Sequence, residues 1–390
     1  MRHDNTTVKS AVSHLLHLNN QETCKPHNMF VFLKTHKTGS STLTTTIQRY
    51  GYIRNLTIAI PKHDSHVISS GKFKPSQVYP GKYDMLVNHV RFDKKKMQKV
   101  MKNGTKYFTI IRDPRTQIES VFGYFTLFKP LHLSPISGFE NFISKPRFFL
   151  NKYRHFRMRN YLKNPNLFDL GFAPKKMEKQ DLVDAAVKKI SKELDLVLIY
   201  EYYNESLLLL RKLLCFSFED ILYVPKGMRS DKRRYTVSDN LRESINKWSW
   251  ADAKLYEEFN KTFWRKIEEY GPTFETDLKY FESLLEEKLK NCTFTGKSTD
   301  DNRTVYLVFN DNTNDTSCEL MKYSDAEMTS LIRIKQYNTT RHTESKNRLC
   351  ILLLPPLLLL LLLLLCCKYA PSQKTAASQT RLIIIAHNST

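Results

Sequence analysis

The chain has 390 residues, with 61 lysines and arginines against 39 acidic residues, which gives a formal net charge of +22. This excess of positive charge favours polyanionic partners, such as nucleotides, anionic glycans, nucleic acid or lipid surfaces. The basic residues are spread among aliphatic and aromatic ones, without an arginine-rich tail or a CxxC…HxxxH zinc pattern, so we expect no nucleic-acid partner.

Short apolar runs alternate with helix signals along the first 215 residues. Strands are predicted at residues 29–33, 83–87, 107–111 and 196–200. Helices are predicted from residue 41 to about 50, from 114 to about 124, where Asp113 caps the start, and from 205 to 214. Because strands that alternate with helices form parallel sheets covered on both faces, we predict an α/β fold with a central parallel sheet flanked by helices.

The composition divides the chain into four parts. Residues 1–28 are a polar lead or the remnant of a stem, and residues 29–290 suit one large catalytic domain. Residues 291–350 are polar and predict a loosely structured carboxyl-terminal extension. Residues 351–390 hold a leucine-rich run and a tail, which is either a membrane segment or a non-native end.

The stretch between the first strand and the first helix is rich in hydroxyl residues and contains a glycine. It reads Lys-Thr-His-Lys-Thr-Gly-Ser-Ser-Thr over residues 34–42. Glycine permits a tight turn, and the N–H groups at a helix start form a nest for an anion. It is not a Walker A loop, because His36 and Val31 stand where that motif has glycine. A Ser/Thr-rich helix cap is the alternative. The candidate phosphate-binding residues here are Lys34, Thr35, Lys37, Thr38, Gly39, Ser40, Ser41 and Thr42.

A second candidate anion-binding element follows the strand at 107–111. Arg112 closes that strand, and Ser120 lies about two helical turns further on. The carboxyl end of a strand in an open α/β sheet borders the crevice where nucleotides bind, and a guanidinium suits a terminal phosphate. Arg112 could instead pair with a carboxylate, and Ser120 could be an ordinary helix serine. Together with the first loop, the two residues predict a site for a nucleotide that carries two separate phosphates.

The sequence resembles the galactose 3-O-sulfotransferases, Golgi enzymes that sulfate galactose in glycolipids and glycoprotein glycans. The stretches that carry the resemblance are residues 32–43, 88–92, 108–114, 167–171, 201–207 with 214–215, and 259–265. The resemblance implies a P-loop-like sulfotransferase fold, the donor 3′-phosphoadenylyl sulfate and a galactose-terminated glycolipid or glycan acceptor. It further implies that the loop with Lys37 binds the 5′-phosphosulfate, that Arg112 and Ser120 bind the 3′-phosphate, and that His36 and His89 are essential to catalysis.

These assignments predict a mechanism without a metal ion. Sulfuryl transfer needs in-line alignment and stabilisation of the leaving oxygen, for which a lysine and backbone amides suffice. We expect Lys37 to stabilise the leaving phosphate oxygen. We expect His89, or with less support His36, to accept the proton of the sugar hydroxyl, since the pKa of histidine lies near neutral pH.

Other interpretations stay open at this point. A kinase or another transferase could use a phosphate loop, the acceptor could be a different glycan, and the chain could be a noncatalytic glycan-binding relative. His63, Asp64 and His66 are weak as a metal site. Glu201 and Asp220 could contact the acceptor or cap helices.

The compartment is predicted from glycosylation sequons and cysteines. Ten N-x-[ST] sequons exceed the number expected by chance, and seven cysteines fit one or two disulfides, so we expect a lumenal domain at the Golgi membrane. Residues 1–28 contain no signal peptide or anchor, and the 17-residue apolar run at 351–367 is at the lower limit of a membrane span. Either the amino terminus is incomplete or the leucine run does not belong to the working protein. The sequence leaves the disulfide pairing and the oligomeric state open.

Overall fold

A computed structural model describes residues 24–156, 158–298, 304–310, 313 and 315–337. The leucine run at 351–367 and most of the polar lead at 1–28 lie outside the described residues. Among the helices that are described, none is both long and apolar enough to cross a bilayer.

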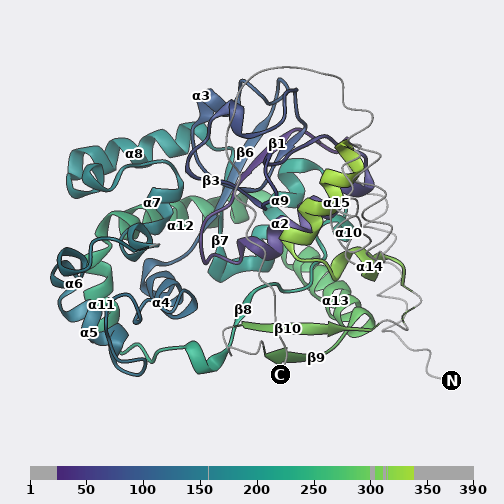
Figure 1. The fold of residues 1–390 in the computed structure, drawn as a ribbon. Coiled ribbons are helices and arrows are strands. Elements are labelled where there is room, and N and C mark those ends of the chain that lie inside the picture. The colour runs from purple at the N-terminus through teal and green to yellow at the C-terminus, as the bar shows by residue number, and fades with distance from the viewer. Residues whose placement is uncertain (1–23, 157, 299–303, 311–312, 314, 338–390) are drawn as a thin grey trace, which may run out of the picture. The chain divides into compact units, whose positions relative to one another are not determined.

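Strands and helices alternate through the first half of the described chain (Figure 1). The strands are β1 Phe30–Leu33, β2 Ile58–Ala59, β3 Val67–Lys72, β4 Met85–Leu86, β5 His89–Arg91, β6 Lys106–Ile111, β7 Leu196–Ile199, β8 Met228–Arg229, β9 Thr293–Ser298 and β10 Thr304–Phe309. The helices are α2 Ser40–Ile53, α3 Lys94–Met97, α4 Pro114–Tyr124, α5 Gly138–Ser144, α6 Pro146–Lys152, α7 Pro165–Asp169, α8 Gln180–Glu193, α9 Tyr203–Leu214, α10 Phe218–Ile221, α11 Asp239–Trp248, α12 Trp250–Tyr270, α13 Phe274–Cys292, α14 Ser317–Met321 and α15 Asp325–Tyr337.

The central sheet has five parallel strands in the order β2-β4-β1-β6-β7, which confirms the predicted α/β fold. β1 lies in the middle, and all four of its side chains are buried. A continuous apolar run is typical of a parallel strand covered on both faces. Loops that leave β4, β1 and β6 therefore emerge next to one another.

Helix α2 is buried although it carries several threonines. The hydroxyls of Thr45 and Thr46 donate to the carbonyl of Thr42 at 2.9 and 3.0 Å. This back-bonding satisfies the hydroxyls of Thr45 and Thr46, so both residues can be buried within α2. Helix α4 begins as predicted, because the Asp113 carboxylate accepts from the Arg115 N–H at 2.8 Å and Pro114 is the first helical residue.

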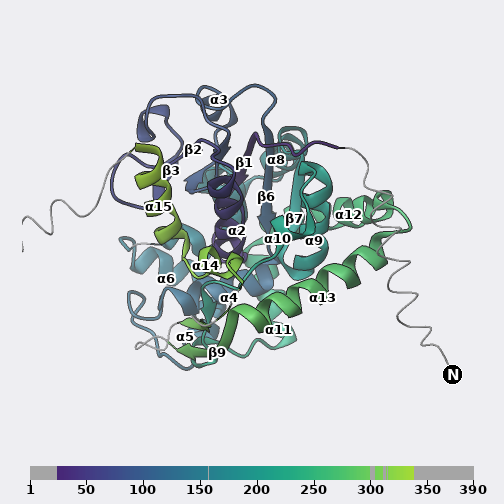
Figure 2. The ribbon, with the colours of Figure 1, turned by 90° about the vertical axis from the view of Figure 1, so that its right-hand side faces the viewer.

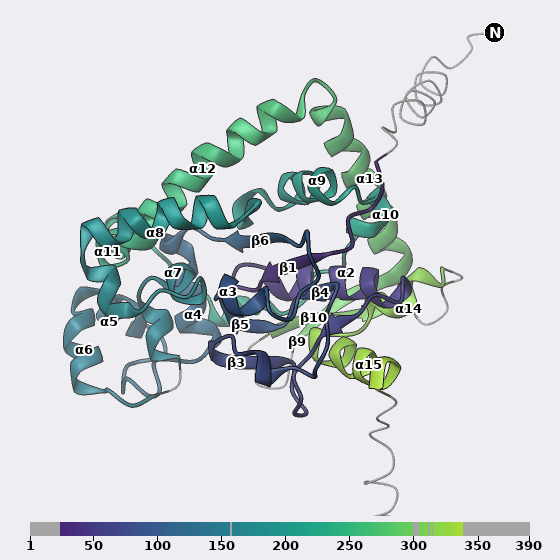
Figure 3. The ribbon, with the colours of Figure 1, turned by 90° about the horizontal axis from the view of Figure 1, so that it is seen from above.

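Different helices cover the two edges of the sheet. Helices α9 and α12 pack beside β7 at one edge, and α15 lies beside β2 at the other (Figures 2 and 3). Along α12, Leu255, Phe259 and Phe263 are buried, whereas Trp264 is 39% exposed and packs edge-on against Tyr202.

The region after residue 290 differs from the loose extension that the sequence predicts. Its described residues include β9, β10, α14 and α15, and the compact unit that contains the sheet runs to Gln336. Met328 and Ile332 are buried at an i, i+4 spacing, so α15 has an apolar side that packs on the domain. This helix was not predicted from the sequence, because its polar residues indicated exposure to solvent. In the structure, several of them bind specific partners within the protein.

Two disulfides link distant parts of the described chain. Cys24 bonds to Cys215 at the end of α9, and Cys292 at the end of α13 bonds to Cys318 in α14. Both pairs agree with the expectation of one or two disulfides. The second pair attaches the segment that leads to α15.

Candidate active site

The predicted site residues follow three neighbouring strands. Lys34 directly follows β1, Arg112 directly follows β6, and His89 comes three residues after β4. Because the strands are parallel, these residues meet at one edge of the sheet. The Arg112 Nη1 donates to the carbonyl of Lys37 at 3.1 Å. The structure therefore joins the two elements that the sequence predicts to bind separate phosphates.

The loop over residues 34–39 turns through left-handed backbone. Lys37 has φ 60° and Gly39 has φ 70°. A Cβ on Gly39 would lie 3.0 Å from the rings of both Tyr200 and Tyr203, so only glycine fits this turn without displacing an aromatic ring. Left-handed residues just before a helix direct backbone N–H groups to one point, which suits an anion.

Several loop hydroxyls bind within the loop itself. The hydroxyls of Thr38 and Ser40 donate to the carbonyl of Thr35, and the Thr35 hydroxyl donates to the carbonyl of Ile110 in β6. These bonds make the loop rigid and attach it to the neighbouring strand. Backbone N–H groups, rather than these three hydroxyls, are therefore the stronger candidates for holding an anion.

Two hydroxyl residues in the first turn of α2, directly after the loop, contact other segments. The Ser41 hydroxyl donates to the Asp325 carboxylate in α15 at 3.5 Å, and the Thr42 hydroxyl accepts from the Lys226 N–H at 2.9 Å. Lys34 is buried and pairs with the same Asp325 carboxylate. Lys34 thus has a carboxylate partner that the sequence did not indicate.

Two cations lie at the turn of the loop. The Lys37 ammonium lies over the Tyr124 ring at 3.5 Å from its centroid, and the Arg112 guanidinium lies over Tyr200 at 4.4 Å. The Arg112 Nε also donates to the Thr116 hydroxyl at 2.8 Å. Burial lowers the pKa of Arg112 below its ordinary value, so a bound anion would stabilise the charged guanidinium.

Ser120 lies on α4 in a buried position, with 3% of its surface exposed. The neighbouring Glu119 forms a buried ion pair with Arg229, with Nη1 and Oε1 2.7 Å apart. The contact of Ser120 with a phosphate stays a prediction.

The two histidines are in contact. The rings of His36 and His89 stack with centroids 4.4 Å apart and an interplanar angle of 25°. The Asp169 carboxylate accepts from the His36 backbone N–H at 2.7 Å and lies 2.9 Å from His36 Nδ1. The Gln117 amide donates to the His36 carbonyl at 2.8 Å. His36 is therefore held at its backbone and at one ring nitrogen, which leaves Nε2 for chemistry.

His89 is kept neutral by its surroundings. Burial, followed by the positive charge of Lys34 and the neighbouring imidazoles of His36 and His66, lowers the pKa of His89 well below 6.5. A hydrogen bond with the Lys34 backbone acts in the opposite direction. At neutral pH the His89 ring therefore carries no charge.

Further residues of the site come from segments far away in the sequence. Tyr161 packs its ring 4.0 Å from that of His36, and burial next to Asp169 raises the pKa of its hydroxyl. Asp169 lies on α7, whose first N–H groups at Asn166 and Leu167 donate to the buried Asp252 carboxylate at 2.7 and 2.9 Å. Asp169 falls within residues 167–171, which carry the family resemblance, but its partner could not be read from the sequence.

The weaker candidates have structural roles. Asp220 caps α10 by accepting from the Ser217 N–H at 3.0 Å, and it pairs with Arg54 at 2.7 Å. Glu201 accepts from the Asp113 N–H at 3.1 Å, and burial raises the pKa of its carboxyl. Asp64 lies 3.4 Å from Arg333, so it has a cation as its partner.

Comparisons with known proteins identify the family of the chain. The model of the galactose-3-O-sulfotransferase family matches residues 5–302. A galactosylceramide sulfotransferase of Mus musculus is 35% identical over 254 residues, which are 64% of this chain and 60% of the relative. Galactose-3-O-sulfotransferase 2 of Homo sapiens is 34% identical over 253 residues, 63% of each protein, and galactose-3-O-sulfotransferase 3 of Bos taurus is 32% identical over 279 residues, 69% of this chain and 65% of the relative. The chain thus spans less than two thirds of the length of these relatives.

The lowered pKa of His89 predicts how its ring titrates. In a protein labelled with ¹³C-histidine, the His89 signal, assigned by its loss in His89→Gln, should titrate with a midpoint below 6.5, and in urea the midpoint should return to about 6.5. Because the unfolded chain takes up this proton first, His89 should lower the free energy of unfolding as the pH falls through 6.5. A midpoint at or above 6.5 in the folded protein would contradict the assignment.

Proposed function

The chain belongs to the galactose-3-O-sulfotransferase family, and on that premise we propose that it transfers the sulfuryl group of 3′-phosphoadenylyl sulfate to a galactose hydroxyl of a glycolipid or glycan. The relatives are named for galactose and its 3-position, which supports that hydroxyl as the acceptor. The observation that carries the proposal is the contact of Arg112 with the Lys37 carbonyl. It puts a guanidinium beside the anion-binding loop, as a donor with phosphates on both its 5′ and 3′ positions requires.

The transfer is a single displacement at sulfur. The acceptor oxygen forms a bond to sulfur while the bond from sulfur to the phosphate oxygen breaks, and adenosine 3′,5′-bisphosphate leaves with the electron pair. Lys37 and the loop N–H groups stabilise the negative charge on the leaving oxygen. Arg112 holds the 3′-phosphate. The proton of the acceptor hydroxyl passes to a histidine.

The contacts of the histidines support His36 as the proton acceptor, the reverse of the order that the sequence suggested. The Asp169 carboxylate orients His36 Nδ1 and stabilises the imidazolium that forms when Nε2 takes a proton. Burial and the Lys34 ammonium disfavour charge on His89. We assign proton acceptance to His36 and assign His89 to hold its ring by stacking.

A nucleotide-binding experiment tests the donor. Adenosine 3′,5′-bisphosphate should raise the melting temperature of the protein more than ATP with magnesium does, because only the former has a 3′-phosphate for Arg112. Lys37→Ala should lower sulfuryl transfer from labelled donor to galactosyl acceptors by at least about 10²-fold, the usual loss when a charge-stabilising group is removed. A larger stabilisation by ATP, or transfer that survives Lys37→Ala, would reject this function.

The role of His36 is tested through its partner. Asp169→Asn should lower kcat by on the order of 10²-fold, because it removes the charge that supports protonation of His36. The matched control is Asp220→Asn, an aspartate of α10 that pairs with Arg54, and it should keep kcat. If Asp169→Asn keeps the wild-type kcat, the assignment of His36 is wrong, and His89 accepts the proton without a contribution from the pair of His36 and Asp169.

We further propose that the domain acts in the lumen of the Golgi, attached to its membrane. The two disulfides and the exposed sequon asparagines Asn55, Asn103 and Asn291 support an oxidising, glycosylating compartment. When the chain is expressed in secretory cells, Asn103→Gln should remove one glycan, measured as a smaller mass shift on endoglycosidase treatment. Asn151→Gln should leave that shift unchanged, because Asn151 is exposed but does not lie in a sequon. A chain without any glycan would argue against a lumenal site.

A further inference from the structure

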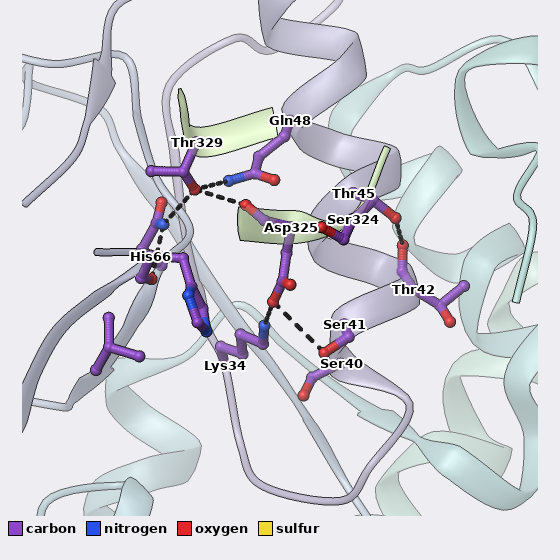
Figure 4. A network of polar contacts seen from close by, with 12 residues as sticks. Lys34, Ser40, Ser41, Thr42, Thr45, Gln48, His66, Ser324, Asp325 and Thr329 are labelled. Atoms are coloured by element: carbon purple, nitrogen blue, oxygen red, sulfur yellow. Dashed lines mark hydrogen bonds and ion pairs between the residues drawn. The ribbon is translucent and has the colours of Figure 1, made fainter. Parts of the chain in front are cut away.

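Helix α15 lies beside the loop that is proposed to bind the donor, although it follows residue 302, where the match to the family ends. Figure 4 shows Asp325 of α15 pointing toward Lys34 and Ser41, and Thr329 pointing toward Gln48. The helix is separated from the loop by more than 280 residues of sequence. The contacts between α15 and the loop are therefore long-range contacts formed by the tertiary fold.

The Asp325 carboxylate connects the two ends of the loop. It pairs with the Lys34 ammonium, and its Oδ2 accepts from the Ser41 hydroxyl at 3.5 Å. Lys34 is the first residue after β1, and Ser41 is the second residue of α2. The Lys34 side chain is 2% exposed, and a buried ammonium is stable only with a partner of opposite charge. Asp325 thus supplies the charge that lets Lys34 stay at the base of the loop.

The Thr329 hydroxyl makes a second connection, one helical turn later. It accepts from the amide groups of Gln48 in α2 at 3.1 Å and Asn88 at 2.9 Å, and it donates to the Asp325 carbonyl at 2.7 Å. Asn88 directly precedes His89. A single hydroxyl therefore joins α15, α2 and the segment that presents a site histidine.

The remainder of α15 is firmly attached to the domain. Met328 and Ile332 are buried, and the Gln336 amide bonds to both the N–H and the carbonyl of Ile58 in β2, at 2.7 and 3.0 Å. Arg333 donates to carbonyls in the segment 61–65. So many directed bonds are characteristic of an integral part of a fold and unlike a plug that leaves when a ligand arrives.

We propose that α15 is a working part of the active site, in which Asp325 and Thr329 are positioning residues. Asp325 holds both ends of the donor loop through Lys34 and Ser41, and Thr329 holds the segment of His89 through Asn88. The inference rests on the proposed sulfuryl transfer. The inference adds a new requirement to that function: residues beyond the part matched by the family are needed for donor binding and for turnover.

The first experiment removes the charge of Asp325 in the full chain. In Asp325→Asn, the KM for 3′-phosphoadenylyl sulfate and the Kd for adenosine 3′,5′-bisphosphate should each rise by roughly 10-fold, equivalent to one lost directed interaction. Ser330→Ala is the control on the same helix, because the Ser330 hydroxyl donates to the Ala326 carbonyl within α15. Tighter binding of the bisphosphate by Asp325→Asn would overturn the proposal, since the carboxylate would then compete with the donor.

The second experiment removes the Thr329 hydroxyl without changing the shape of the side chain. Thr329→Val should lower kcat by on the order of 10- to 100-fold with a nearly constant KM for the donor, as expected when a catalytic segment shifts but the donor loop stays intact. Thr329→Ser, which retains the hydroxyl, should restore kcat. Assays run below the melting temperature of each variant separate this effect from unfolding. Equal kcat values for the valine and serine variants would overturn the role of Thr329.

Hydrogen exchange tests the same contacts without an activity assay. Amides over residues 34–42 should exchange faster in Asp325→Asn than in wild type or Ser330→Ala, and those over 86–91 should exchange faster in Thr329→Val. Unchanged exchange would overturn the proposal even in an active enzyme. If exchange is faster in the variants but the wild-type protein neither binds the bisphosphate nor transfers sulfate, the proposed function and the catalytic role of α15 are rejected, whereas the structural contacts of α15 are retained.

Discussion

The parallel pairing of β4, β1 and β6 is the constraint on which the rest of the site depends. Side by side, these strands end at one edge, so His89, the loop after Lys34 and Arg112 leave the sheet as neighbours. Parallel strands need crossover connections, and α2 is the one that starts in the donor loop. The tight turn at Gly39 then follows from the need to pass from a buried strand into a buried helix beneath two tyrosine rings.

The cations of the site differ in their partners. Lys34 and Arg229 are buried with carboxylate partners, Asp325 and Glu119. Arg112, in contrast, donates to a hydroxyl and a carbonyl and lies over an aromatic ring, contacts that leave its positive charge in place. Paired cations stabilise the architecture, and cations held by neutral groups can attract a phosphate. The strong net positive charge of the chain is therefore less informative than the partners of a few cations.

Local features of the sequence were sufficient to predict four of the five strands of the central sheet, α2 and α4. Continuous apolar runs and the Asp113-Pro114 helix start are signals carried by adjacent residues. Asp169 and Asp325 were missed as partners because they lie 133 residues from His36 and 291 residues from Lys34. No periodicity connects such pairs. Helix α15 was missed for a related reason. Hydropathy treats Asp325 and Thr329 as solvent-exposed, because it contains no information about a buried lysine or amide that they contact in the folded protein.

The disulfide between Cys24 and Cys215 gives the domain a particular mechanical property. It joins the chain just ahead of β1 to the end of α9, and the His27 N–H donates to the Leu214 carbonyl beside it at 2.8 Å. Tension applied from the amino-terminal side reaches this covalent link before it reaches β1. The force then passes through the disulfide into α9, so it does not act to separate β1 from the neighbouring strands β4 and β6. If the domain were attached through a segment on its amino-terminal side, the loop after β1 would keep its position under force as long as the disulfide is oxidised.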